Sequence, residues 1–449
     1  MPDYFQWRSS PIRAVYLALT AIALISIGCF LFFRPGMEGD TQALVNHSLR
    51  AIQCVRDGKW GQCPEAGPFT VLQYIPAWIL ELLGASKGVV LHFLAYLSML
   101  TGVLSFFEIY RTLKSRGEAL AWSGVLLLMT GFWIRYINLS SNEMLASFLI
   151  LMAVTSVLRG KSLLTAGFYF WASALTKDMA AIFLIFWLGV TVIFVPDARL
   201  SWKNAAKLSG AVVLGLLCDI AFNLFRFGTV MNQGYLNPEF FIHDRALQTS
   251  FFFAQWFSPA GGLWIFWTSF GIVMMATAWI LVGLSLRRSW SRMIPALAVF
   301  SIFGALTFGF SKWYSPMGGY CWGVRFFLPW IPALSLYLFW VYAGEFKRLL
   351  STCAARGMWF WSGSIVLAVT AFPQYQFLFR QSLIGRVLSP ASCNGLTQWD
   401  YYNCVLWQRW PWGILSFYAP FPRIDLFLLS AFMASWVIMI CLMIRKMCR

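Results

Sequence analysis

Two acidic residues, Glu38 and Asp40, closely follow the first long uncharged stretch of the chain, Leu17–Phe33. A carboxylate in this position can act as a general base that takes the proton of an attacking hydroxyl group. Asp40 is the favoured base and Glu38 is the alternative. The competing interpretation is structural, because Asp40 and Thr41 would also suit the cap of a helix that begins there.

Basic residues that would balance an anionic leaving group also lie near the ends of apolar segments. The candidates are Lys177, Arg226, Lys312 and Arg325. Arg325 follows several glycines, which allow close backbone approach, and a guanidinium can hold phosphate through two hydrogen bonds. Lys177 is costly at the end of an apolar segment unless it extends to the surface, pairs with Asp178 or finds another anion.

Other polar residues are candidates for contacts with a substrate. Glu143 begins a predicted helix, where the helix dipole alone would favour a negative charge. Tyr235, His243 and Tyr320 lie in predicted loops and could contact a sugar, although interfacial tyrosines and solvated loop histidines are common alternatives. Asp219 lies within an apolar segment, and we favour a structural partner for it over a catalytic role.

The composition indicates that these residues belong to a membrane protein. The chain of 449 residues is 59% hydrophobic, 18% aromatic and only 11% charged. A soluble domain carries roughly 25% charged residues, and repeated uncharged runs of about 20 residues are typical of helices that cross a bilayer. The net charge of +17 fits basic cytoplasmic loops, and no basic arm or low-complexity run points to nucleic acid as a partner.

Apolar runs predict an all-α polytopic protein with about twelve transmembrane helices. The expected spans lie near residues 14–33, 89–109, 120–137, 143–158, 163–176, 179–195, 208–225, 263–285, 293–310, 326–343, 358–373 and 426–444. The first run is interpreted as a retained signal anchor, because no small-residue cleavage site follows it.

Charge orients this topology. If the N-terminus is cytoplasmic, the short cytoplasmic segments hold 19 of the 34 Lys and Arg residues but only four of the 17 acids. This surplus places both termini in the cytoplasm. The long loops, at 34–88, 226–262, 311–325 and 374–425, then lie outside, which indicates that the extracytoplasmic face is the working face.

The first outside loop is predicted to contain two helices in the plane of the membrane surface. Residues 41–56 have an amphipathic pattern, and residues 67–84 are apolar but interrupted by prolines. The alternative, a further span at 69–83, would reverse the topology downstream and conflicts with the distribution of charge.

The cysteines in these outside loops predict two disulfides. Cys54 and Cys63 share the first loop, and Cys393 and Cys404 share the last. Both pairs would face an oxidising compartment. Free thiols are the alternative, and no spacing in the chain is typical of a zinc site.

Several stretches, taken in order, resemble the GT-C superfamily of membrane glycosyltransferases. A carboxylate after the first span is followed by the two interfacial helices. The stretches SSNEMLASFLILMAV (140–154), GFYFWASALTKDMAAIFL (167–184), NLFRFGTVMNQGY (223–235), FSPAGGLWIF (257–266) and GGYCWGVRFFLPWIPAL (318–334) come next. They are similar to bacterial members related to protein mannosyltransferases. The resemblance covers residues 34–336 and none is recognised beyond about residue 345.

The resemblance implies an inverting hexosyl- or pentosyltransferase in a bacterial inner membrane. Residues 1–345 would form the catalytic core, and residues 346–449 would add C-terminal helices. The enzyme would move a sugar from a polyprenyl phosphate to a glycan, lipid or protein acceptor on the periplasmic face. Asp40 or Glu38 would be the base. Lys177, Arg325, Arg226 and Lys312 would contact the donor phosphate, and Glu143, Tyr235, His243 and Tyr320 would contact substrate.

Other functions stay open from the sequence alone. A flippase for a lipid-linked glycan would need charges in the middle of spans, and the chain has few of these, mainly Asp219. A non-catalytic assembly protein is a further alternative. A glycan polymerase or ligase would share the topology but use a diphosphate-linked donor. No cofactor is expected. A divalent cation is not favoured, because one pair of carboxylates does not make a coordination shell.

Overall fold

The computed structural model describes residues 39–137, 142–236, 240–259, 261–313, 324–355 and 398–408, with residues 366, 367, 370, 393 and 396. The predicted spans at 14–33 and 426–444 lie outside the described residues, as does most of 358–373. Glu38 and Tyr320 also lie outside them, and so does the side chain of Asp40. The expected count of twelve spans and the division after residue 345 stay predictions.

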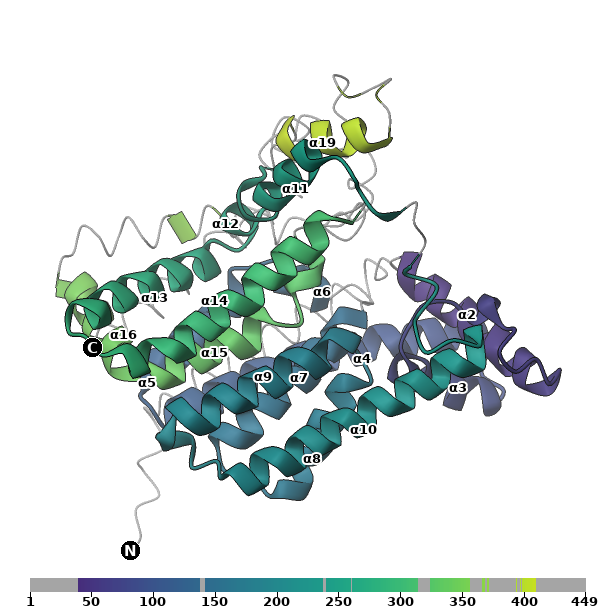
Figure 1. Ribbon diagram of the computed structural model, residues 1–449, viewed down its shortest axis with the longest axis horizontal. Coiled ribbons are helices and arrows are strands. Elements are labelled where there is room, and N and C mark those ends of the chain that lie inside the picture. Colours follow the sequence, from purple (N-terminus) through teal and green to yellow (C-terminus); the bar gives the residue numbers. More distant parts are fainter. Residues whose placement is uncertain are drawn as a thin grey trace, which may run out of the picture.

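Helices form nearly all of the regular structure in the described part of the chain (Figure 1). The first half contains α2 (Gly39–Arg56), η2 (Pro64–Ala66), α3 (Val71–Leu82), α4 (Lys87–Lys114), α5 (Glu118–Met129), α6 (Trp133–Ile137), α7 (Asn142–Leu158), α8 (Leu163–Ala174), α9 (Asp178–Phe194), η3 (Pro196–Ala198) and α10 (Trp202–Phe227). The second half contains α11 (Arg245–Phe257), α12 (Leu263–Phe266), α13 (Thr268–Leu286), α14 (Trp290–Ser311), η5 (Arg325–Phe327), α15 (Ile331–Val341), α16 (Ala343–Ala355) and α19 (Gln398–Gln408).

The chain is an all-α polytopic membrane protein. Four of the described helices, α4, α10, α13 and α14, are long and apolar enough to cross a bilayer. Shorter apolar helices pack among them, with α7 against α4 and α8, and α9 against α10 and α14. The bundle encloses fully buried aromatic side chains that include Trp122, Trp133, Trp187 and Trp267.

Three predicted single spans are interrupted in the structure. Residues 120–137 divide into α5 and α6, and Gly131 lies between them so close to the Trp267 ring that a Cβ atom would come within 2.3 Å of it. Residues 263–285 divide into α12 and α13. The third span, 326–343, starts as the short η5 and continues as α15, which has Pro332 in its first turn. Apolar runs predict burial but not these breaks, because tertiary contacts set them.

The two helices predicted in the first loop are present as α2 and α3, and they pack on each other at one end of the bundle (Figure 1). Their position in the membrane surface stays a prediction. The disulfide between Cys54 and Cys63 ties the end of α2 to the turn that follows it. The backbone amides of Gly61 and Cys63 donate to the carbonyls of Phe225 and Arg226, at the end of α10. This loop is therefore fixed to a transmembrane helix.

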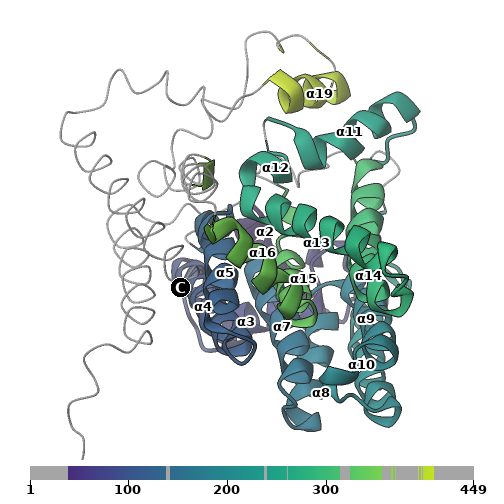
Figure 2. The same cartoon turned by 90° about the vertical axis from the view of Figure 1, so that its left-hand side faces the viewer.

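The loop at 226–262 contains a helix, α11, that was not predicted from the sequence. Asp244 caps it by accepting a hydrogen bond from the amide of Ala246 at 2.9 Å. The helix α19 lies beside α11 in both ribbon views (Figures 1 and 2). Trp407 donates to the Ser250 hydroxyl at 2.8 Å. The predicted disulfide between Cys393 and Cys404 is present at this contact.

Arg226 joins α10 to the first loop from a fully buried position. Its guanidinium donates to the carbonyls of Gly67 and Phe69, the latter at 2.6 Å, and to the side chain of Asn223. These contacts support a structural role in place of the donor-phosphate contact expected from the sequence. Three of its donor bonds are taken up by the protein itself.

We expect Arg226→Met to destabilise the protein by at least about 2 kcal/mol, because two buried carbonyls would lose their donor. The measurement is thermal unfolding of the purified protein in detergent. Arg245→Met, at the exposed start of α11, is the matched control and should leave the midpoint nearly unchanged. Equal midpoints for Arg226→Met and the wild type would contradict this role.

Candidate active site

Three chain segments that are distant in the sequence converge on the carboxylate of Glu143. Glu143 lies in the first turn of α7, Lys177 is the residue directly before α9, and Arg325 begins η5. Lys177 Nζ and Arg325 Nε each lie 3.5 Å from Glu143 Oε1. We call these three residues the Glu143 cluster.

The Glu143 cluster is largely removed from solvent. Glu143 is 5% exposed and Arg325 is 9% exposed, while the side chain of Lys177 is 28% exposed. Two cations therefore share one buried carboxylate, and the cluster itself carries one excess positive charge. Helices α7 and α9 also direct their N-termini toward this point, where a helix dipole favours an anion.

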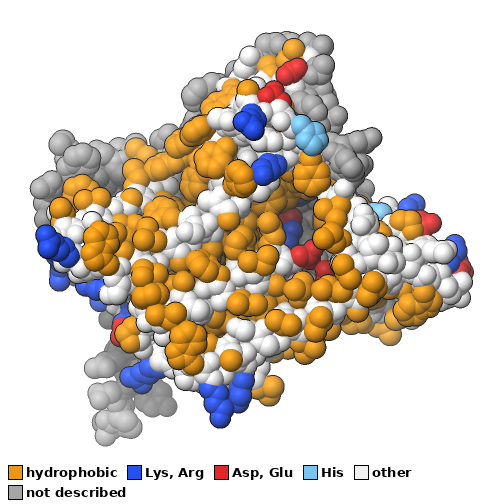
Figure 3. Space-filling model, in the orientation of Figure 1, with side chains coloured by type: hydrophobic (Ala, Val, Ile, Leu, Met, Phe, Trp, Pro, Cys, Tyr) orange, Lys and Arg blue, Asp and Glu red, His pale blue; other side chains and the backbone are white. Residues whose placement is uncertain are grey.

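A hollow in the molecular surface contains charged side chains of both signs, although the face around it is mainly apolar (Figure 3). Isolated charges in such surroundings are costly, and mutual pairing lowers the cost. The pairing of Lys177 with Glu143 differs from the expected alternative, pairing with its neighbour Asp178. It also gives Glu143 a role beyond that of a simple helix-start charge.

A second cluster lies directly beside the first. Asp178 follows Lys177 in the chain. The Asp178 carboxyl group lies close enough to that of Asp219, in α10, for an electrostatic interaction, and Asp219 is also attracted by the charge of Arg226. Asp219 Oδ1 accepts a hydrogen bond from the amide of Val71, at the start of α3, at 3.2 Å. As expected from the sequence, Asp219 has a structural partner.

The start of α3 is fixed against the turn that presents Lys177. The Leu72 amide donates to the Leu175 carbonyl at 3.3 Å, and the Gln73 side chain donates to the Thr176 carbonyl at 3.3 Å. Tyr74 lies one residue further along. Burial raises the pKa of its hydroxyl, which donates to the Ala66 carbonyl. Helix α3 is therefore part of the wall of the site.

Aromatic residues form a second wall next to Arg325. Phe326 stacks on Phe310 with ring centroids 4.2 Å apart and lies 5.2 Å from the Trp313 ring. Trp313 in turn contacts Tyr235 at 6.0 Å. Rings arranged in this way can bind apolar chains or the faces of sugars.

The remaining candidates lie near this aromatic wall or outside the described residues. The Ile242 amide donates to the Lys312 carbonyl at 2.8 Å, which places exposed His243 one residue from this contact. Lys312 Nζ lies 4.1 Å from the centre of the Phe308 ring. The structure gives no contact between the phosphate candidate Lys312 and the Glu143 cluster.

Sequence reasoning missed two features of the site. Asp178 approaches Asp219, which lies 41 positions further along the chain, and Gln73 contacts Thr176, which lies 103 positions further along. Sequence spacing alone could not indicate contacts over such separations. The only signal was that Asp219 and Gln73 are polar residues within apolar stretches. Such residues need partners, but the sequence does not say which.

The described residues contain one group of three potential metal ligands, Cys54, Cys63 and Glu65. The two cysteines are joined in a disulfide, so their sulfur atoms are not thiolate ligands. This group therefore does not fit a metal centre.

Comparison with known proteins gives few matches. No protein-family model matches the chain, and no curated protein matches it. Two solved structures are similar, those of ArnT from Cupriavidus metallidurans in the apo state and bound to undecaprenyl phosphate. Each is 14% identical and covers 90% of this chain, with TM-scores of 0.43 and 0.41 over 77% and 76% of the other chain.

We expect Glu143→Gln to destabilise the protein by about 3–5 kcal/mol, because Lys177 and Arg325 would lose their shared counter-charge in a buried setting. Glu345→Gln is the matched control, since Glu345 pairs with a half-exposed Arg292 and should cost about 0–1 kcal/mol. Thermal unfolding in detergent measures both. A loss in Glu143→Gln no larger than in the control would show that the carboxylate does not hold the cluster together.

Proposed function

We propose that the protein is a GT-C-type glycosyltransferase that transfers a sugar from a polyprenyl phosphate to a glycan, lipid or protein acceptor. The observation that carries the proposal is the Glu143 cluster, in which two cations share one buried carboxylate. Its excess positive charge, at the ends of two helices, is suited to one phosphate group. The ordered stretches in residues 34–336 that resemble the superfamily support the same function.

The proposed reaction is a single displacement with inversion at the sugar. The acceptor hydroxyl gives its proton to Asp40, or to Glu38 in its place, while its oxygen forms a bond to the anomeric carbon. The bond between that carbon and the phosphate oxygen breaks, and the phosphate leaves with the electron pair. Lys177 and Arg325 stabilise the charge that grows on the phosphate oxygens during this step.

Each wall of the site has a part in this proposal. The aromatic wall beside Arg325, from Phe326 to Tyr235, would contact the sugar or the first isoprene units. The interfacial helices would hold the acceptor side, because α2 begins at the residue before Asp40 and α3 contacts the turn before Lys177. We place the site on the periplasmic face of a bacterial inner membrane, in agreement with the charge of the loops.

The expected effect of Asp40→Asn is a loss of transfer of about 100-fold or more, because general-base catalysis contributes about that much. The variant is expressed in a strain that lacks the protein, at matched membrane level, and the glycans are compared by mass spectrometry. If the glycans of the variant lack the mass of one hexose or one pentose, the result would support the proposal and show which class of sugar is transferred. Asp57→Asn is the matched control, since Asp57 is an exposed acid of the same loop.

An undiminished increment in Asp40→Asn would remove Asp40 as the base and leave Glu38 to be tested in the same way. A missing increment of a whole oligosaccharide would instead indicate a ligase with a diphosphate-linked donor.

We also propose that transfer proceeds without a bound metal ion. Purified enzyme treated with EDTA should keep its activity within about twofold, because the cations of the Glu143 cluster supply the charge that a metal would otherwise provide. A loss of activity with EDTA that Mg²⁺ or Mn²⁺ restores would contradict this.

A further inference from the structure

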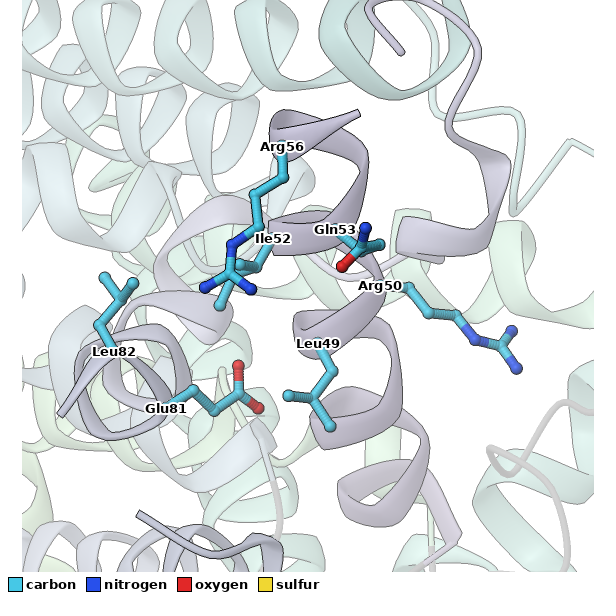
Figure 4. A pocket seen from close by; sticks show the side chains of 7 residues that line it. All are labelled: Leu49, Arg50, Ile52, Gln53, Arg56, Glu81 and Leu82. Carbon is cyan, nitrogen blue, oxygen red and sulfur yellow. The ribbon is translucent and has the colours of Figure 1, made fainter. Parts of the chain in front are cut away.

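A pocket of about 440 Å³ lies between the interfacial helices, away from the Glu143 cluster (Figure 4). It is lined by Leu49, Arg50, Ile52, Gln53, Arg56, Glu81 and Leu82. Glu81 lies eight residues beyond Gln73, the point at which α3 meets the active site, and this corresponds to about 12 Å along a helix. The pocket is therefore a separate site from the proposed catalytic one.

The charged groups of the pocket are opposed but not paired. Arg56 and Glu81 both direct their charged ends into the pocket, whereas Arg50 points away from it (Figure 4). No ion pair joins Arg56 to Glu81 in the described part of the chain, although other ion pairs there are present. The space between a guanidinium and a carboxylate is thus open to a ligand that carries groups of both kinds.

The two carboxylate oxygens of Glu81 differ in their hydrogen bonds. Its Oε2 accepts a hydrogen bond from the Ser48 hydroxyl at 2.8 Å, and its Oε1 is buried without a hydrogen-bond partner. Burial raises the pKa of this carboxyl, and the Ser48 hydrogen bond opposes that effect. A buried acceptor without a donor is unfavourable, so a ligand with an N–H or O–H group would satisfy it.

One lining residue of the pocket, Leu82, is apolar and 69% exposed. Its neighbours in the chain, Ile79 and Leu83, do not line the pocket but are also exposed, at 54% and 77%. Exposed apolar side chains next to a charged pocket, on helices expected to lie in the membrane surface, are typical of contact with lipid.

We propose that the pocket binds the headgroup of a phospholipid that has a hydrogen-bond donor beside its phosphate, such as phosphatidylethanolamine. The phosphate would contact Arg56, the ammonium would pair with the Glu81 carboxylate, and the acyl chains would lie along Leu82. This site is independent of the proposed sugar transfer. A bound lipid would join the C-terminal halves of α2 and α3.

The test measures lipid binding to the purified full-length protein by native mass spectrometry in detergent. The probes are dioleoyl lipids whose headgroups are ethanolamine, its mono- and dimethyl forms, and choline, which has no N–H donor. The wild type should prefer the ethanolamine lipid to the choline lipid by about fivefold, and affinity should fall as methyl groups are added. Inorganic phosphate at millimolar concentration is added as a competitor.

Two variants separate the two contacts. Arg56→Ala should weaken the binding of all these lipids by about tenfold, because each of them has the phosphate group. Glu81→Gln should reduce the preference for ethanolamine over choline to less than about twofold. That preference is a ratio measured within one variant, so it does not depend on how much of the protein is folded. Lys59→Ala, an exposed cation of the same loop outside the pocket, is the control and should bind as the wild type does.

Equal binding of the ethanolamine and choline lipids to the wild type would overturn the proposed donor contact. Arg56→Ala with the affinity of Lys59→Ala would overturn the phosphate contact. Displacement of the lipid by millimolar inorganic phosphate would show that the pocket recognises free phosphate and not a lipid.

Discussion

The contact on which the proposed site depends is that of one buried carboxylate with two cations. Glu143 holds Lys177 and Arg325 at 3.5 Å each, and these residues belong to the starts of α7, α9 and η5. Without Glu143, two positive groups would face each other in an apolar bundle. With it, the three residues keep one excess positive charge, which supports the proposed binding of a phosphate there.

The surrounding structure keeps that cluster in place from two sides. Helix α3 is fixed to the turn before Lys177 through Gln73, and to α10 through Asp219. On the other side, Phe326 packs between Phe310 and Trp313 and so fixes the backbone beside Arg325. The first loop is therefore a structural part of the site, and the disulfide and Arg226 that hold it matter for the same reason.

The sequence alone predicted the class of fold and several members of the site, but not their partners. Apolar runs indicated the long helices, and the cysteines of the outside loops indicated both disulfides, because each signal is local. Lys177, Arg325 and Glu143 were singled out by residue type and position. Their meeting at one point, and the structural use of Arg226, depend on packing between helices far apart in the chain, which periodicity does not encode.

The most direct test of the central claim compares binding of polyprenyl phosphate and of polyprenol, which lacks the phosphate, to the wild type and to Arg325→Ala. The proposed site predicts that the wild type binds the phosphate form at least about tenfold more tightly, and that Arg325→Ala loses most of this difference. Equal affinity of the wild type for the two lipids, or an unchanged preference in Arg325→Ala, would contradict a phosphate site at the Glu143 cluster.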